Sequence, residues 1–161
     1  MRSLLAACIF AVLTASAFAG DTQHSRLTTN MLEQTSLLMD KAGNSQDSAT
    51  LLAHMASNAV VSVTFPKNPE IPKMTFSKDE YAKHLRQTWA ITKNVTIRRL
   101  STQYQIADDG QSATATSTFR QTATLVDTGQ TFVSEGRQIA EVHLIEGVAQ
   151  ARRIDVTISY K

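Results

Sequence analysis

Four polar residues in the C-terminal half carry the groups best suited to acid–base chemistry or to ligand contact: Gln121, Gln138, Arg153 and Asp155. The strand pairing expected from the turns places all four on one otherwise apolar face of a sheet. A charged group on such a face is costly unless it is paired or reached by water. Asp155 is therefore a candidate general base, and Arg153 is a candidate partner for an anionic ligand. The alternative is a structural ion pair, because residues two apart on one strand share a face.

Two further side chains, His54 and Tyr81, are candidates to assist Asp155 in catalysis. Three aromatic residues are candidates to line a ligand cavity: Tyr104, Phe119 and Trp89. Aromatic residues at helical spacing are more often plain core than ligand contacts, so core packing is the alternative for Tyr81 and Trp89. For His54 the alternative is a buried histidine at the edge of the core.

Metal, thiol and nucleic-acid chemistry have little support in the sequence. No two histidines have the spacing of a metal site, so we expect neither a metal nor a cofactor. The chain contains one cysteine, Cys8, which lies in the N-terminal apolar run. The net charge of +2 argues against nucleic acid as an obligate partner.

The N-terminus has the three parts of a secretion signal. Arg2 is followed by an apolar run over Leu4–Leu13, and Ala17-Phe18-Ala19 supplies small residues before Gly20. The run is shorter than the roughly 20 residues of a membrane-spanning helix. We therefore expect a signal peptide over 1–19 that is cut after Ala19, and a secreted or periplasmic domain over 20–161 without a membrane span. The alternatives are a buried N-terminal helix and a lipid anchor on Cys8.

The first half of the expected domain is helical, with one strand. Apolar periodicity, breakers and capping residues predict a helix over 21–40 that ends before Gly43, a short helix from Asp47 or Ser48, a strand over 59–65 and a helix over 77–90. Three prolines at positions 66, 69 and 72 predict a loop between that strand and the third helix. Ser77-Lys78-Asp79-Glu80 is a capping box at the start of the third helix.

The second half is expected to form four long antiparallel strands. Tight turns are predicted at Asp109-Gly110, Thr128-Gly129 and Glu146-Gly147. The apolar residues of the first long strand change parity near Arg98-Arg99, which predicts a β-bulge there and hence a strongly bent sheet.

Two-residue turns fix which residues lie opposite one another. The predicted rows across the four strands are Ile106, Ala113, Leu144, Ala149; Tyr104, Ala115, Val142, Ala151; Thr102, Ser117, Ala140, Arg153; and Leu100, Phe119, Gln138, Asp155. The same register puts an apolar cluster on the outer face: Ile139, Ile154, Val156 and Ile158. A homodimer through the outer sheet face would bury this cluster, and a covering terminal segment is the alternative.

The order of elements resembles the nuclear transport factor 2-like superfamily over nearly all of Asp21–Lys161. The local signals are the segments Leu51–Val61 and Phe76–Tyr81. This resemblance implies an α+β roll of the cystatin-like type, in which three N-terminal helices pack on the concave face of a bent, mostly antiparallel sheet. It also implies relatives that include polyketide-cyclase-like enzymes, steroid isomerases, dehydratases and binding domains, many of which dimerise through the sheet.

Three functional hypotheses follow. The leading one is a non-catalytic domain that holds a small, partly apolar molecule in the cone-shaped pocket. The second is a metal-free lyase or isomerase that uses Asp155 as the base. The third is a protein-interaction module that acts through the outer sheet face.

Overall fold

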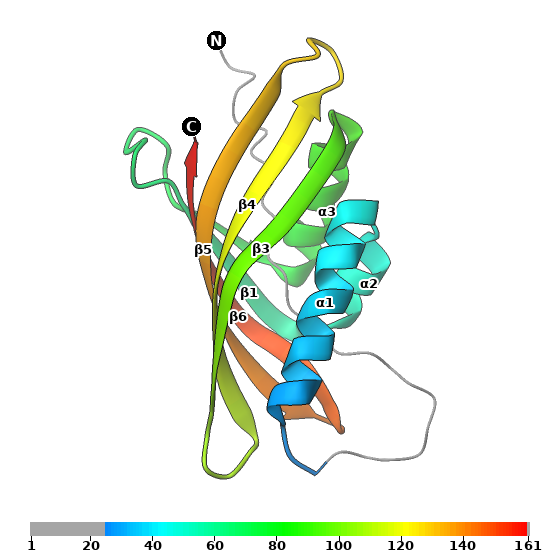
Figure 1. Ribbon diagram of the computed structural model, residues 1–161, viewed down its shortest axis with the longest axis vertical. Coiled ribbons are helices and arrows are strands. Elements are labelled where there is room, and N and C mark those ends of the chain that lie inside the picture. The colour runs from blue at the N-terminus through cyan, green and yellow to red at the C-terminus, as the bar shows by residue number, and fades with distance from the viewer. Residues whose placement is uncertain (1–24, 161) are drawn as a thin grey trace.

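The computed structural model describes residues 25–160, which form three helices packed on one face of a curved six-stranded sheet (Figure 1). The elements are α1 (Thr29–Ser45), α2 (Ser48–Ala53), β1 (Met55–Thr64), β2 (Met74–Ser77), α3 (Lys78–Ala90), β3 (Thr92–Ile106), β4 (Ser112–Leu125), β5 (Thr131–Ile145) and β6 (Val148–Tyr160). The predicted signal peptide, its cleavage position and Cys8 lie outside the described residues. The expected α+β class is confirmed.

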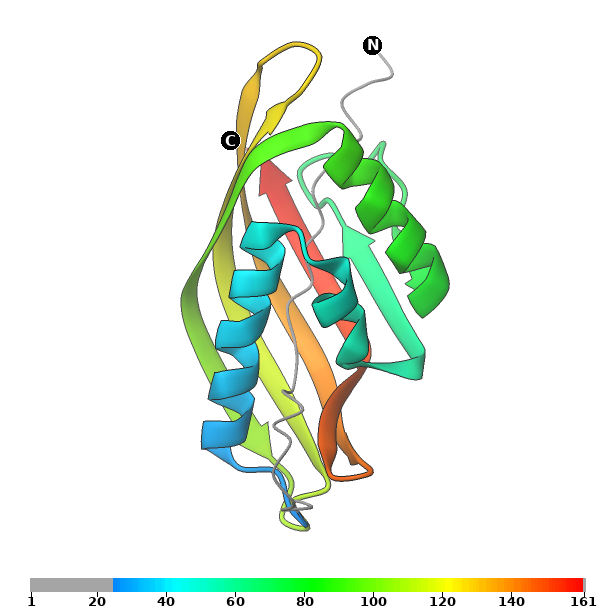
Figure 2. The same ribbon diagram turned by 90° about the vertical axis from the view of Figure 1, so that its right-hand side faces the viewer.

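The sheet has the strand order β2-β1-β6-β5-β4-β3. β1 runs parallel to β6, and every other neighbouring pair is antiparallel. Figure 2 shows all three helices in front of the same face of this sheet, with α1 beside β3 and α3 near β1 and β2. The helix-facing side of the sheet, called the inner face here, is therefore the side that carries the core.

Helix α1 is longer at its C-terminus than the sequence predicts. The helix begins at Thr29, later than the predicted start, and the Thr28 side chain accepts a hydrogen bond from Met31 N there. Its last residue is Ser45, and the next residue, Gln46, caps it with a φ of 57°. Gly43 was expected to end the helix, but it lies within the last turns against β3. A Cβ at this position would lie 2.7 Å from the Cδ1 of Ile97, so the glycine permits close packing.

The other two helices begin where the sequence predicts. Asp47 caps α2 and accepts a hydrogen bond from Thr50 N at 3.1 Å. The predicted capping box of α3 is present, with Ser77 and Glu80 bonded to each other's backbone. β1 begins at Met55, four residues before the predicted strand, and β2 lies in the segment predicted as a proline-rich loop. β2 pairs with β1 over four residues.

The hairpin turns explain where the predicted register is right and where it is shifted. β3 and β4 pair as predicted, with Ile106 opposite Ala113. Ala113 lies opposite Val142 rather than Leu144, because the β4–β5 loop contains four residues and is closed by a Leu125 N to Gln130 O hydrogen bond of 2.9 Å. A shift of two residues keeps each side chain on its predicted face.

Strand β3 contains the bulge that the parity change predicts. The register with β4 shifts between Arg99 and Ser101, so Leu100 is the extra residue. Arg99 takes the inner position next to Phe119, and Leu100 is 54% exposed. The predicted inner position of Leu100 is therefore wrong by one residue.

A second bulge, in β6, overturns the predicted face of the last strand. Val142 pairs with Ala151 but Glu141 pairs with Arg153, which leaves Arg152 as the extra residue. Beyond this point odd and even positions exchange faces. Arg153 and Asp155 therefore lie on the outer face instead of the predicted inner face.

The same bulge buries three of the four residues predicted to form a dimer interface: Ile154, Val156 and Ile158, each 1% exposed. These side chains belong to the hydrophobic core on the inner face. Only Ile139 lies on the outer face as predicted, and it is half-buried. The outer apolar cluster that suggested a dimer through this face is thus absent from the described residues. No helix in residues 25–160 is long and apolar enough to span a membrane.

Candidate functional site

The inner face carries an unusual group of buried polar side chains on β4 and β5. Ser117 of β4 lies opposite Gln138 of β5, and Gln121 lies opposite Ser134. All four are at most 3% exposed, although the positions around them on these strands are mostly alanine. We call these four residues the inner polar group. Buried polar side chains normally occur only where hydrogen bonds satisfy them.

Gln121 departs from that rule. Its side chain is 0% exposed, and neither its amide nitrogen nor its amide oxygen has a hydrogen-bond partner. The hydroxyl of Thr102 on β3 is likewise buried without a partner, and Thr102 lies opposite Ser117. Each unpaired buried group costs on the order of 1–3 kcal/mol. A ligand that both donates and accepts hydrogen bonds would satisfy the Gln121 amide.

An aromatic ring separates the two polar pairs. Phe119 lies between Ser117 and Gln121 on β4 and is opposite Gly136. A Cβ on Gly136 would overlap the Phe119 ring and the Thr157 carbonyl oxygen, so the missing side chain provides the space for the ring. The inner polar group and Phe119 together form a buried patch of the inner face that is part polar and part aromatic.

The other aromatic side chains that were predicted to line a ligand cavity or to assist catalysis have three different environments. Tyr104 is on the inner face, but its hydroxyl lies 2.7 Å from Ser36 Oγ and donates to Leu32 O at 3.3 Å, so it is engaged by α1. Trp89 is half-buried and packs against the core. Tyr81 is 0% exposed and packs against Phe76, with ring centroids 6.3 Å apart, in agreement with the core alternative.

His54 is buried at the opposite end of the sheet. Its side chain is 5% exposed, and burial, followed by the positive charge of Lys78, lowers its pKa from 6.5 to about 4. The imidazole is therefore neutral at pH 7. The backbone carbonyl of His54 accepts a hydrogen bond from Ala151 N, so His54 lies beside the start of β6. Gln121 lies in the row of paired residues that reaches β6 at Tyr160, at the other end of that strand. These rows are nine residues apart on β6, which corresponds to roughly 25–30 Å.

Asp155 and Arg153 form an ion pair on the outer face. Arg153 Nε donates to Asp155 Oδ2 at 2.7 Å, and the two side chains are 55% and 37% exposed. The hydrogen bond and charge of Asp155, followed by the charge of Glu141, raise the pKa of Arg153. The structural ion pair given as the alternative is present, and the carboxylate is not positioned to act inside the cone.

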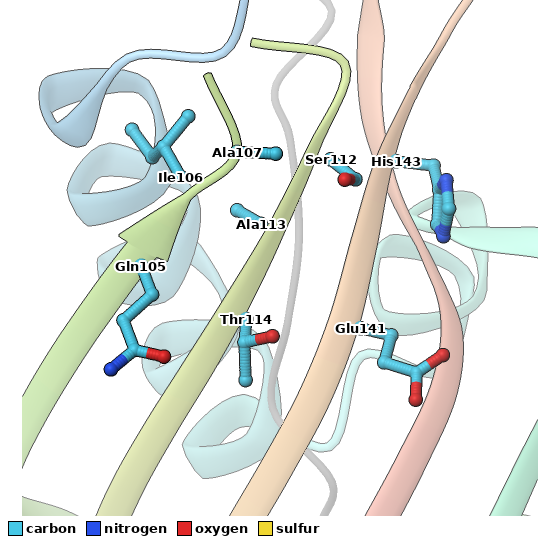
Figure 3. Close-up of a pocket in the computed structure, with 8 residues that line it drawn as sticks. All are labelled: Gln105, Ile106, Ala107, Ser112, Ala113, Thr114, Glu141 and His143. Carbon is cyan, nitrogen blue, oxygen red and sulfur yellow. The ribbon is translucent and has the colours of Figure 1, made fainter. Parts of the chain in front are cut away.

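The outer face has a shallow polar trough of about 430 Å³ near the β3–β4 turn. Figure 3 shows Gln105, Thr114 and Glu141 side by side on three neighbouring strands, with Ser112 and His143 beyond them. The trough offers amide, hydroxyl, carboxylate and imidazole groups. None of these five side chains is fully buried, so water can hydrate all of them. This trough is a weaker candidate than the inner polar group.

The sequence did not predict a row of polar contacts between α1 and β3, which we call the polar seam. Ser36 contacts Tyr104, Asp40 binds Arg99, and the Asn44 amide bonds to both backbone groups of Ile97. Residues 36, 40 and 44 are spaced four apart and so lie on one face of the helix. This spacing is the sequence signal that could have revealed the seam. The predicted rows already place Ser117 on the inner face, and Ser134 shares the face of Gln138 because the two are four residues apart on β5. Only their pairing with Gln138 and Gln121 depends on the corrected β4–β5 register.

Within residues 25–160, no group of three or more acidic, histidine or cysteine side chains converges as a metal site would. The inner polar group contains amides and hydroxyls, which bind small molecules through hydrogen bonds.

Comparison with known proteins identifies the fold. Similar solved structures include a conserved protein from Planctomyces limnophilus, a ketosteroid isomerase-like protein from Erwinia carotovora atroseptica and a hexachlorocyclohexane dehydrochlorinase, LinA-type3, from Novosphingobium barchaimii. Their TM-scores are 0.68, 0.59 and 0.60, at 12%, 15% and 9% sequence identity. The matches cover 80%, 78% and 76% of this chain, and 94%, 92% and 80% of the other chains.

These similarities show that the chain has the nuclear transport factor 2-like fold, as the element order predicts. At such low identity they establish the fold alone. No protein-family model matches the sequence, and no curated protein matches it.

Proposed function

We propose that this protein is an exported binding domain that holds a small, neutral, partly apolar molecule against the inner face of its sheet. The observation that carries the proposal is the Gln121 amide, which is fully buried with neither polar atom paired. A fold that maintains such a group without a ligand loses stability. A bound molecule with an adjacent donor and acceptor would recover the lost hydrogen bonds.

The surroundings of Gln121 define the class of ligand. The inner polar group contains only amides and hydroxyls, and the buried neighbours on β4 and β5 are Phe119 and small apolar residues. An anion placed there would lose its water without gaining an opposite charge. A primary amide, a lactam or a hydroxy-ketone that carries a ring to pack on Phe119 fits this surface better.

The enzyme hypothesis has less support. Asp155, its proposed base, lies on the outer face in an ion pair with Arg153, and His54 lies far along the sheet from Gln121. Among the residues described on the inner faces of β4 and β5, no side chain can take up a proton at neutral pH. The isomerase-like and dehydrochlorinase names of similar structures belong to those proteins.

The proposal of export rests on the N-terminal sequence. Arg2, the apolar run over Leu4–Leu13 and the small residues before Gly20 are typical of a cleaved signal peptide. N-terminal sequencing of the protein from culture supernatant or periplasm would test the cut after Ala19. Recovery of the uncut chain in the cytoplasm would contradict it.

A thermal-unfolding screen tests the binding proposal. The probes are neutral aromatic amides, lactams and hydroxy-ketones, each paired with a carboxylate of the same shape, for example benzamide with benzoate. We expect at least one neutral compound to raise the melting temperature of the wild-type protein, and its carboxylate partner to have no effect. The same compound should not stabilise Gln121→Met, which replaces the amide by an apolar chain of similar length.

Thr114→Val is the matched control, because it alters the outer trough and leaves the inner face unchanged. It should respond to the neutral compound as the wild type does. A preference for the carboxylates, or stabilisation that is lost in Thr114→Val and kept in Gln121→Met, would overturn the proposal.

A further inference from the structure

Two large exposed leucines lie close together at the edge of the molecule. Leu37 of α1 is 64% exposed and Leu100, at the β3 bulge, is 54% exposed. Both line a groove of about 600 Å³ between the helix and the strand. β3 forms one edge of the sheet, and it is 15 residues long. A long edge strand beside exposed apolar side chains is a surface prone to association.

The exposed side of α1 beside this groove changes from negative to positive charge along the helix. Glu33, Leu37 and Lys41 are spaced four apart, so they lie in one row along the helix, and all three are exposed. The row therefore reads acidic, apolar, basic over about 12 Å. Such a row is complementary to itself when a second copy lies antiparallel to it.

The strand side of the groove adds a second basic residue, Arg98, and its end of the groove follows from how the helix lies on the strand. α1 contacts β3 with Ser36 at Tyr104 and Asn44 at Ile97, so the helix and the strand run antiparallel. Arg98 therefore lies at the Lys41 end of the groove, and Glu33 lies at the other end. Asp40 is bound to Arg99, so it does not reverse the sign of the basic end.

We propose that a second copy of the chain docks on this groove across a two-fold axis that passes close to Leu37 and Leu100. The axis places the Glu33 of one copy against the Lys41 and Arg98 of the other, twice in each dimer. The four leucines cover one another at the centre. This surface replaces the outer sheet face as the dimer interface, since the bulge in β6 turns the apolar residues of that strand into the core.

Charge reversal tests this pairing without altering the core. Glu33→Lys turns all four attractive contacts per dimer, two with Lys41 and two with Arg98, into repulsive ones, and Lys41→Glu turns two of the four. Sedimentation equilibrium should show the dimer dissociation constant rising by about tenfold or more in each variant. An equimolar mixture of the two variants should form a heterodimer that is at least about tenfold tighter than either variant's homodimer, because three of its four charged contacts are between opposite charges and only the contact of the substituted position 33 with Arg98 is repulsive.

Leu37→Ser should weaken the dimer as well, and circular dichroism establishes that each variant is folded. Ile139→Lys is the matched control on the outer sheet face, and it should leave the dimer unchanged. A wild-type protein that stays monomeric at about 1 mM, where even weak pairs associate, would overturn the proposal. A dimer that Ile139→Lys breaks while both charge reversals leave it intact would overturn it too. None of these outcomes depends on ligand binding at Gln121.

Discussion

Arg99 of β3 binds Asp40 of α1 through two parallel hydrogen bonds, from Nε to Oδ2 at 3.0 Å and from Nη2 to Oδ1 at 2.8 Å. The two side chains are only 16% and 19% exposed. This pair joins the first helix to the edge strand at the point where the bulge places Arg99 on the inner face. The bulge is thus what allows an edge-strand arginine to hold the helix.

Removal of one partner should leave the other charge partly buried and unpaired. Asp40→Asn or Arg99→Met is therefore expected to lower the free energy of unfolding by about 2 kcal/mol, as measured by urea denaturation. Arg120→Met is the control, because its ion pair with Glu135 is 50% and 38% exposed. That variant should change stability by less than about 0.5 kcal/mol. Equal losses of unfolding free energy on breaking the Asp40–Arg99 pair and the Arg120–Glu135 pair would contradict a larger contribution of the Asp40–Arg99 pair.

The depressed pKa of His54 makes stability depend on pH. The folded chain has a pKa of about 4 and the unfolded chain about 6.5, so the unfolded chain takes up a proton first as the pH falls. The stabilisation is fully present above pH 6.5 and is lost as the pH falls toward 4. After allowance for solvent screening, the loss is about 2 kcal/mol.

The measurement is the urea midpoint of wild type and His54→Gln at pH 7.5, 5.5 and 4.5. The wild type should lose more stability over this range than the variant, whose side chain does not titrate. His84, whose pKa burial also lowers, contributes in the same direction to both proteins, so it cancels in the comparison. His143→Gln on the outer face should behave as the wild type does, and parallel curves for all three proteins would refute a buried neutral His54.

Gly136 should tolerate no side chain while Phe119 keeps its position. Gly136→Ala is expected to lower the free energy of unfolding by about 1–3 kcal/mol, because its Cβ overlaps the ring and a backbone oxygen of β6. Gly136→Ala combined with Phe119→Leu removes the clash with the ring and should lose less than the sum of the two single changes. A double variant whose loss of unfolding free energy equals the sum of the two single losses would contradict a clash between the Gly136→Ala side chain and the Phe119 ring.

The sequence is enough to predict the α+β class, the order of the main elements and the inner position of the two glutamines. Gln121 and Gln138 stayed on the predicted face because the four-residue β4–β5 loop shifted the register by two, and a shift of two preserves parity. Their contact with a ligand remains a prediction.

The site residues of β6 were misplaced because one extra residue reverses every later position. The signal was present in the apolar pattern: Ala149 and Ala151 are odd, whereas Ile154, Val156 and Ile158 are even. The same change of parity located the bulge in β3. The missing amide partners of Gln121 could not be predicted, because hydrogen-bond satisfaction depends on contacts between distant segments.

Native mass spectrometry of the purified protein, before and after mild denaturation, tests the central claim most directly. We expect the wild type to retain a neutral small molecule that mild denaturation releases. Gln121→Met, with unchanged circular dichroism, should carry no such molecule. A wild type that is free of ligand, or the same retained mass on Gln121→Met, would contradict the assignment of the inner polar group as the binding site.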